Sequence, residues 1–214
     1  MQTIETDRLV LRNFRRSDAA GLFAYLHEPK ASCFLSLKLA DMKEAEVEAE
    51  NRSADDEHVA VCLKGTGQLI GDLFAVPEAD TFSGGWNFNP AFSGQGYAFE
   101  AARALFSDLF EHKGARRLYA YVEDHNIASQ RLCERLGMRR EGLFVEFVSF
   151  KNDDAGDPVY ENTMQYAILR REWMSRGKAS PLVGTGVADT PASAGRPQAV
   201  QKLPRDQHKS NDAN

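Results

Sequence analysis

The sequence contains no long apolar run and no export signal. A bilayer-spanning helix needs roughly 20 consecutive apolar residues, and polar or charged residues interrupt every apolar stretch well before that length. The first residues, MQTIE, include neither the basic nor the apolar segment of a secretion signal. These absences predict a cytoplasmic protein that does not bind a membrane.

Cysteine and histidine are also sparse. The three cysteines, Cys33, Cys62 and Cys133, are scattered and form no Cys-x-x-Cys pair, which argues against a disulfide framework and a structural zinc site. Four of the five histidines are isolated and lack metal-ligand spacing, namely His27, His58, His112 and His208. We therefore expect reduced thiols in a core and no bound metal.

Large apolar side chains are abundant enough for one folded domain. The 214 residues include 13 Phe, 6 Tyr and 2 Trp, and a folded unit of this size buries about 70% of the surface of its unfolded chain. Residues 1–174 are predicted to form this domain. Residues 175–214, rich in Pro, Ala and Ser, contain no aromatic residue and are predicted to be a disordered tail, with a partner-binding arm as the alternative.

The formal charge of -5 is distributed unevenly between these two parts. Six Lys or Arg and three Asp give residues 175–214 a charge of +3, so residues 1–174 carry -8. An acidic domain disfavours binding to nucleic acid, because phosphate contacts need basic side chains. The same acidity is compatible with a cationic or amine substrate.

Apolar periodicity and capping signals predict strands and helices in mixed order. Ser17 and Asp41 stand at N-cap positions of two early helices, and Gly114 and Gly137 end two later ones. The expected strands occupy residues 9–11, 59–63, 69–76, 82–88, 118–122, 141–150 and 162–169. Because the obvious strand-helix-strand crossovers lie only in the middle of this order, we expect a mixed α/β fold.

A glycine-containing loop joins a strand to a long helix at residues 89–98 (NPAFSGQGYA). Backbone N–H groups at a helix N-terminus attract anions, and Gly94 and Gly96 allow a close approach of the backbone, so the loop suits a phosphate or pyrophosphate. A tight turn that needs glycine only for its dihedral angles explains the same pattern. A dinucleotide fingerprint fails at Phe99, and neither a Walker A motif nor a nucleophile elbow around Ser93 is present.

A second pattern follows about 30 residues later at residues 122–138 (VEDHNIASQRLCERLGM), and it reads as a strand, a polar turn and a short helix ended by Gly137. Together with the opening residues 5–12 (ETDRLVLR) and the closing residues 166–173 (YAILRREW), the two patterns resemble the GNAT superfamily of N-acetyltransferases. The similarity is greatest to its ribosomal-protein N-terminal acetyltransferases. The resemblance implies a mostly antiparallel central sheet with splayed middle strands and flanking helices.

The resemblance also implies acetyl-CoA as co-substrate and a set of residues that bind it. The pyrophosphate is expected at the backbone N–H groups of the loop, and the pantetheine arm along the preceding strand. Asn126 and Ser129 match the family residues at the thioester end, although Asn126 alone reads as a helix N-cap and Ser129 as an ordinary helix residue. The remaining expected contacts are Trp86, Asn87 and Phe88 on the strand, and Gly94, Gln95, Gly96, Tyr97 and Ala98 in the loop.

Three positions depart from the more familiar family pattern. No carboxylate stands on the strand before the loop, Cys133 replaces the tyrosine that many members use as an acid, and Ser93 replaces a basic residue or Gln. Ser129 is therefore expected to donate the proton to the leaving thiolate. Glu123 and His125, at the end of a central strand, are the preferred candidate bases, and further candidates are Asp124, Glu146 and Glu161.

These observations predict direct acetyl transfer from acetyl-CoA to a primary amine. The resemblance favours a protein or peptide N-terminal α-amine. The alternatives are a small amine, such as an amino sugar, polyamine or antibiotic, and a CoA-binding regulatory module without catalysis. We expect a monomer or a homodimer that binds no nucleic acid.

Overall fold

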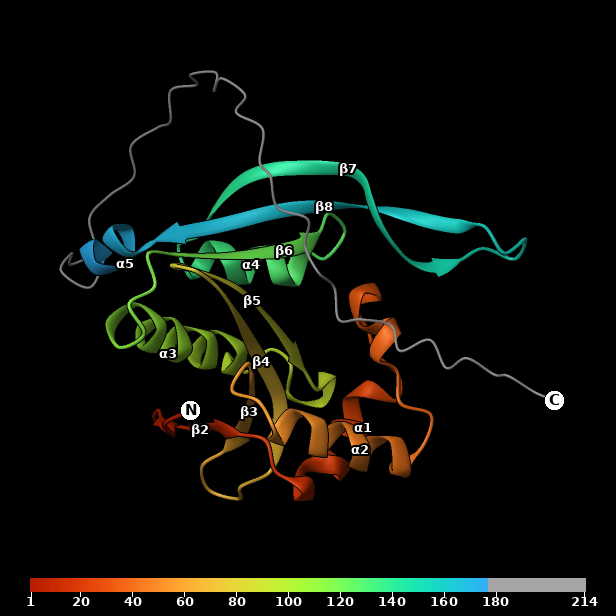
Figure 1. Ribbon diagram of the computed structural model, residues 1–214, viewed down its shortest axis with the longest axis horizontal. Coiled ribbons are helices and arrows are strands. Elements are labelled where there is room, and N and C mark those ends of the chain that lie inside the picture. Colours follow the sequence, from red (N-terminus) through yellow and green to blue (C-terminus); the bar gives the residue numbers. More distant parts are fainter. Residues whose placement is uncertain (177–214) are drawn as a thin grey trace. The chain divides into compact units, whose positions relative to one another are not determined.

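The computed structural model describes residues 1–176, so the predicted tail lies outside the described residues except for Ser175 and Arg176. An eight-stranded sheet in the order β1-β2-β3-β4-β5-β6-β8-β7 forms the centre of this part (Figure 1). The strands are β1 (Ile4–Glu5), β2 (Leu9–Asn13), β3 (His58–Leu63), β4 (Leu69–Glu78), β5 (Thr81–Phe88), β6 (Arg117–Glu123), β7 (Arg139–Asn152) and β8 (Pro158–Leu169).

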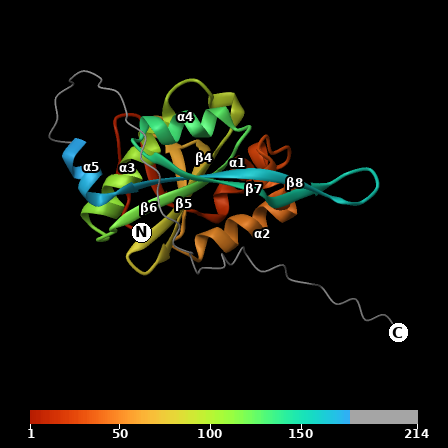
Figure 2. The same cartoon turned by 90° about the horizontal axis from the view of Figure 1, so that it is seen from above.

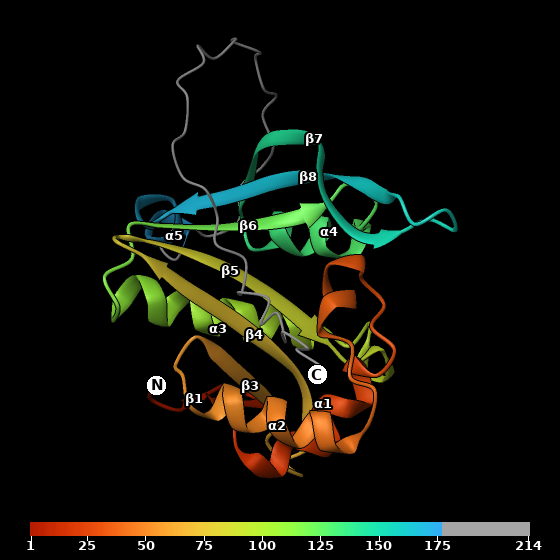
Figure 3. The same ribbon diagram turned by 45° about the vertical axis from the view of Figure 1, so that its right-hand side comes forward.

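Two middle strands of the sheet separate from each other. All neighbouring strands are antiparallel except β5 and β6, which are parallel and are joined by helix α3 (Tyr97–Glu111). They pair only where Thr81–Ser83 meets Arg117–Tyr119, and beyond this point they diverge (Figure 3). The other edge of residues 84–88 pairs with β4. The predicted mixed α/β fold, with a mostly antiparallel sheet and splayed middle strands, is confirmed.

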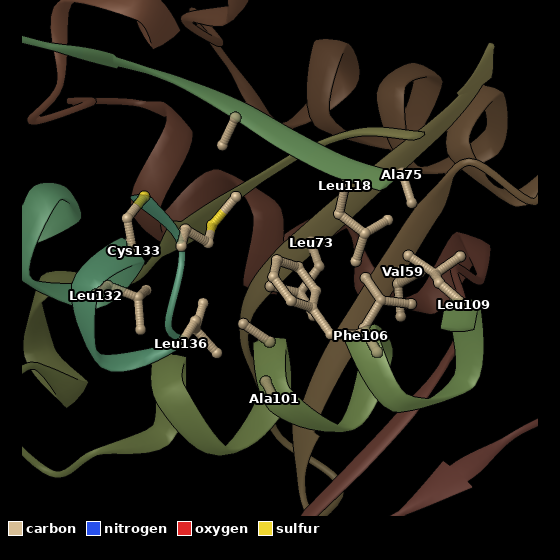
Figure 4. Packing of buried hydrophobic residues seen from close by; sticks show 14 of the residues in the cluster. Val59, Leu73, Ala75, Ala101, Phe106, Leu109, Leu118, Leu132, Cys133 and Leu136 are labelled. Carbon is tan, nitrogen blue, oxygen red and sulfur yellow. The ribbon is translucent and has the colours of Figure 1, made fainter. Parts of the chain in front are cut away.

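Helices cover the two faces of the sheet in different places. α3 and α4 (Ile127–Arg135) bury side chains such as Phe106 and Leu132 against one face (Figure 4). α1 (Ala19–Leu26) and α2 (Met42–Ser53) pack on the opposite face of β3 and β4, around Leu22 and Ala49. The long β7–β8 hairpin extends past both of these helices (Figure 2). Beyond them, β7 contacts the 3-10 turn η2 (Ser32–Leu37).

Short 3-10 turns and a last helix complete the described part. The turns are η1 (Arg16–Asp18), η2 (Ser32–Leu37) and η3 (Pro90–Phe92). The expected N-cap at Ser17 is wrong: Ser17 lies inside η1, and the Asp18 carboxylate accepts the Arg15 N–H and pairs with Arg12. The chain continues after β8 into α5 (Arg170–Arg176), which the sequence did not indicate. Among the helices of residues 1–176, none is long and apolar enough to cross a membrane.

Candidate active site

The glycine loop has the geometry of an anion site at the start of α3. Gly94 and Gly96 adopt positive φ angles of 76° and 81°, which other residues rarely adopt. Gly96 is the N-cap of α3 and makes no side-chain cap, so the first helical N–H groups lack intrahelical acceptors. Among the turn and cap hydrogen bonds of residues 1–176, none uses the N–H of Gln95, Gly96, Tyr97 or Ala98. These four groups are available to an anion.

Arg8 supplies a cation beside this loop. No functional role for Arg8 was predicted from the sequence. Its guanidinium donates to the Gln95 carbonyl oxygen at 3.0 Å and stacks over the Tyr97 ring at 4.5 Å. Arg8 also pairs with Glu100 in the first turn of α3, and the Thr6 hydroxyl donates to the same carboxylate at 2.6 Å. The opening motif therefore anchors the loop. In the sequence, Thr6 and Arg8 were the only sign of this contact, and the residues that they bind, Glu100 and Gln95, lie about 90 positions later in the chain.

A hydrogen bond joins two predicted site residues across the splay. The Trp86 indole N–H on β5 donates to Ser129 Oγ on α4 at 3.1 Å. Trp86 lies three residues beyond the last β5–β6 pair, where the two strands have separated. Since an indole N–H can only donate, Ser129 Oγ accepts this bond and its own proton remains free for another acceptor.

The network continues from Ser129 to a buried carboxylate. Asn126 caps α4 by accepting the Ser129 N–H at 3.2 Å, as its sequence context predicted, and its side-chain amide lies 3.3 Å from Glu123 Oε2. Glu123, which is 5% exposed, also accepts the Cys33 N–H from η2 at 3.2 Å. Burial and the Glu123 charge raise the pKa of Cys33, so this thiol stays protonated. Trp86, Ser129, Asn126, Glu123 and η2 thus form one connected group.

The other candidate bases lie around this group. His125 is exposed, and its Nδ1 is 3.7 Å from Asp124 Oδ1. Asp124 accepts the Asn162 side-chain amide at 2.8 Å. Glu161 accepts the Ser32 hydroxyl of η2 at 2.6 Å. Glu146 is exposed and sits at a positive φ of 48° in β7, with its N–H bonded to Asn162 Oδ1.

Cys133, where many family members carry the acid, points into the core. Its side chain is fully buried beside Leu132 and Leu136 (Figure 4). Burial raises the pKa of Cys133 to about 12. Ser129 lies one turn earlier on α4 and is half-buried. Of these two residues, only Ser129 lies within reach of the gap between β5 and β6.

Three features of the described residues fit the pantetheine arm and the pyrophosphate of coenzyme A. The free edge of β5 can pair with the amides of the pantetheine arm, and the glycine loop offers N–H groups and the Arg8 cation to the phosphates. Within residues 1–176, no cluster of three His, Cys, Asp or Glu residues could hold a metal ion.

Comparisons with known proteins agree with this arrangement. The GNAT acetyltransferase domain model matches residues 8–139. The uncharacterized N-acetyltransferase YnaD of Bacillus subtilis is 30% identical over 79% of this chain and 98% of its own length. A fungal FsC-acetyl coenzyme A-N(2)-transacetylase from Aspergillus fumigatus is 31% identical over 45% of this chain and 39% of its own length.

A solved structure supports the same assignment. The GNAT-family acetyltransferase of Bacillus anthracis superimposes with a TM-score of 0.72 and is 26% identical, covering 80% of this chain and 100% of its own. The family model spans more than half of the chain, and the sheet has the splayed strands that the resemblance implied. The chain belongs to the GNAT superfamily and is an acetyl-CoA-dependent N-acyltransferase.

Proposed function

We propose that the protein transfers the acetyl group of acetyl-CoA directly to a primary amine, with the α-amine of a protein or peptide as the acceptor class. The observation that carries this proposal is the connected group of Trp86, Ser129, Asn126 and Glu123 at the β5–β6 splay. It brings a hydroxyl donor and a buried carboxylate to the point where the thioester is expected. A general base and a general acid both accelerate acyl transfer from a thioester to an amine.

The binding contacts assigned from the sequence remain part of the proposal. The N–H groups of Gln95, Gly96, Tyr97 and Ala98 hold the pyrophosphate, and the positive φ at Gly94 orients the loop. Trp86, Asn87 and Phe88 pair their free backbone edge with the pantetheine arm. When bound, acetyl-CoA supplies an activated acetyl group and a thiolate leaving group. Asn126 keeps the α4 N-terminus aligned with the thioester end.

Glu123 is the proposed base. An amine acceptor is mostly protonated at neutral pH, so it must lose a proton before it attacks a carbonyl carbon. Glu123 lies at the end of β6, and the described residues supply no cationic side chain in ion-pair contact with it; its hydrogen-bond donors are Cys33 and Asn126. Its position at the splay lets it act on the amine directly or through one water molecule.

Ser129 is the proposed acid. As the nitrogen–carbon bond forms and the carbon–sulfur bond breaks, the sulfur takes the electron pair and the Ser129 O–H donates to it. The indole N–H of Trp86 fixes the direction in which that hydroxyl can donate. His125 stays an alternative base, because its exposed ring lies two residues beyond Glu123.

Thiol release from acetyl-CoA, measured over a panel of amines and N-terminal peptides with mass spectrometry of the products, tests the proposal. We expect Glu123→Gln to lower kcat by about 100-fold or more, whereas Glu134→Gln, on the exposed side of α4, leaves kcat unchanged. A loss on His125→Gln in place of Glu123→Gln would move the base to His125. Tight acetyl-CoA binding without turnover of any acceptor would favour the CoA-binding regulatory module instead.

A further inference from the structure

Three aromatic rings gather beside the candidate base, on the face of the sheet opposite α3 and α4. Tyr121 of β6 lies on the same face as Glu123, because strand residues alternate in direction. Its ring centroid is 6.0 Å from that of Phe144 and 5.8 Å from that of Phe147, both on β7, and the two phenylalanine rings are 5.0 Å apart. Phe147 is nevertheless 45% exposed. These three rings are called the aromatic wall below.

A bulge in β7 brings the wall together. Between the pairs Phe144–Thr163 and Val148–Glu161, β7 advances four residues while β8 advances two. The bulge contains Glu146 at positive φ, a conformation that is strained for a non-glycine residue. Asn162 holds it by accepting the Glu146 N–H at 2.9 Å and donating to Asp124 at the end of β6. The hairpin is thus bent toward the candidate site.

An unused hydroxyl lies at the base of the wall. Thr163 of β8 is opposite Glu123 on one side and Phe144 on the other, so its side chain shares their face. The residue is 4% exposed, and its Oγ1 is buried without a hydrogen-bond partner among the described residues. A buried hydroxyl left unpaired is destabilising. Thr163 therefore leaves one unsatisfied polar atom beside Glu123 and Phe144.

The charges around the wall are negative. Glu123 is adjacent to Thr163 across the strands, and Glu161 lies two residues before Thr163 on β8. Among residues 1–176, the Ser32 hydroxyl is the side-chain partner of Glu161. On the far side, Glu78 accepts the Tyr119 hydroxyl, and its charge acts on Tyr121. Two arginines on this face, Arg117 and Arg139, are both paired with Glu141. Aromatic faces and carboxylates together favour a cation.

We propose that the aromatic wall and Glu161 bind a second positive charge of the acceptor, one that stays protonated while the reacting amine is neutralised. The acceptor class is then an amine that carries a further ammonium or guanidinium group. Within the acceptor class proposed above, such an acceptor is a peptide with a basic residue after its α-amine, and a small diamine is the minimal probe of the same two charges. This inference rests on the proposed function, because it assigns the acceptor of that same site.

Matched acceptors test the inference. The ratio of kcat/KM for 1,4-diaminobutane to that for n-butylamine measures recognition of the second charge, and peptides with Lys or Met at the second position provide the peptide arm. We expect the wild type to favour the charged member of at least one pair. Phe147→Leu should lower that ratio about two- to fivefold, as loss of an exposed cation–π contact implies. Phe147→Tyr should preserve it.

Val145→Ala is the matched control, since Val145 is exposed on the same strand and lies outside the wall. It should leave the ratio and the activity unchanged. Calorimetric titration with 1,4-diaminobutane supplies a readout without turnover, and weaker binding to Phe147→Leu than to wild type would support the subsite even if no acceptor were acetylated. Turnover of both members of each pair with equal kcat/KM, or equal effects of Phe147→Leu and Val145→Ala, would overturn the inference and leave the proposed function standing.

Discussion

Replacing Trp86 with phenylalanine tests whether the indole N–H orients the Ser129 hydroxyl. The substitution keeps an aromatic ring but removes the donor that lies 3.1 Å from Ser129 Oγ. Ser129 can then turn its proton toward other acceptors, and the fraction of hydroxyl groups aimed at the thioester sulfur falls. A neutral hydrogen bond contributes about 0.5–1.5 kcal/mol net. If that free energy acts on the transition state, kcat falls about 2- to 13-fold.

A double-mutant cycle distinguishes the loss of hydroxyl orientation from a general packing defect. Ser129→Ala alone should lower kcat about 100-fold or more and should change the affinity for acetyl-CoA much less. When Ser129 is absent, the indole has no hydroxyl to orient, so Trp86→Phe should cost nothing further in the Ser129→Ala background. Steady-state kinetics of thiol release gives kcat and KM for all four proteins.

Two results would refute this reasoning. One is an equal loss from Trp86→Phe in both backgrounds, since independent effects add. The other is a change confined to the KM for acetyl-CoA, which would mean that Trp86 only shapes the pantetheine slot. Thermal unfolding of the four proteins serves as the control, because a drop in Tm on Trp86→Phe alone would attribute the loss to packing.

Three further predictions concern the glycine loop and the buried thiol. Gly96→Ala should weaken CoA binding modestly, because the added Cβ meets only Arg8, at 3.6 Å, and the remaining cost is the positive φ at this position. Gly96→Pro should abolish CoA binding. Equal calorimetric affinities of the two variants for CoA would contradict this prediction. Arg8→Leu should raise the Kd for CoA several-fold at low salt, and Arg103→Leu, on the exposed side of α3, should not. Burial raises the pKa of Cys133 to about 12, so about one Cys133 thiol in ten thousand is ionised at pH 8. Iodoacetamide should therefore alkylate Cys133 far more slowly in the native protein than in urea. Mass spectrometry of the alkylated protein measures both rates.

Local signals in the sequence predicted most of the elements. Asp41 accepts the Glu44 N–H at 2.9 Å as an N-cap, and Gly114 and Gly137 end α3 and α4 with positive φ angles of 72° and 81°. Such features depend on residues within one helical turn, so they can be read from neighbours in the sequence. The N-cap predicted at Ser17 is wrong because the neighbouring Asp18 accepts the backbone N–H of this turn and also pairs with Arg12.

The connections within the candidate site were not readable in the same way. Trp86 and Ser129 were each matched to a family position, but the bond between them spans 43 residues and exists because β5 and β6 separate. The contact of Cys33 with Glu123 spans 90 residues and depends on where η2 meets the sheet. Residue types indicate the chemistry, whereas the fold determines which of them meet.

The β7 bulge brings together the three rings of the aromatic wall. Regular alternation along residues 141–150 would put Phe144 and Glu146 on one face and Phe147 on the other. The ring contacts instead group Phe147 with Phe144 and Tyr121. Because the bulge depends on Asn162, a residue of another strand, its position follows from tertiary contacts that no local pattern encodes. The bulge therefore joins Phe147 to Phe144 and Tyr121, which a regular strand would have separated.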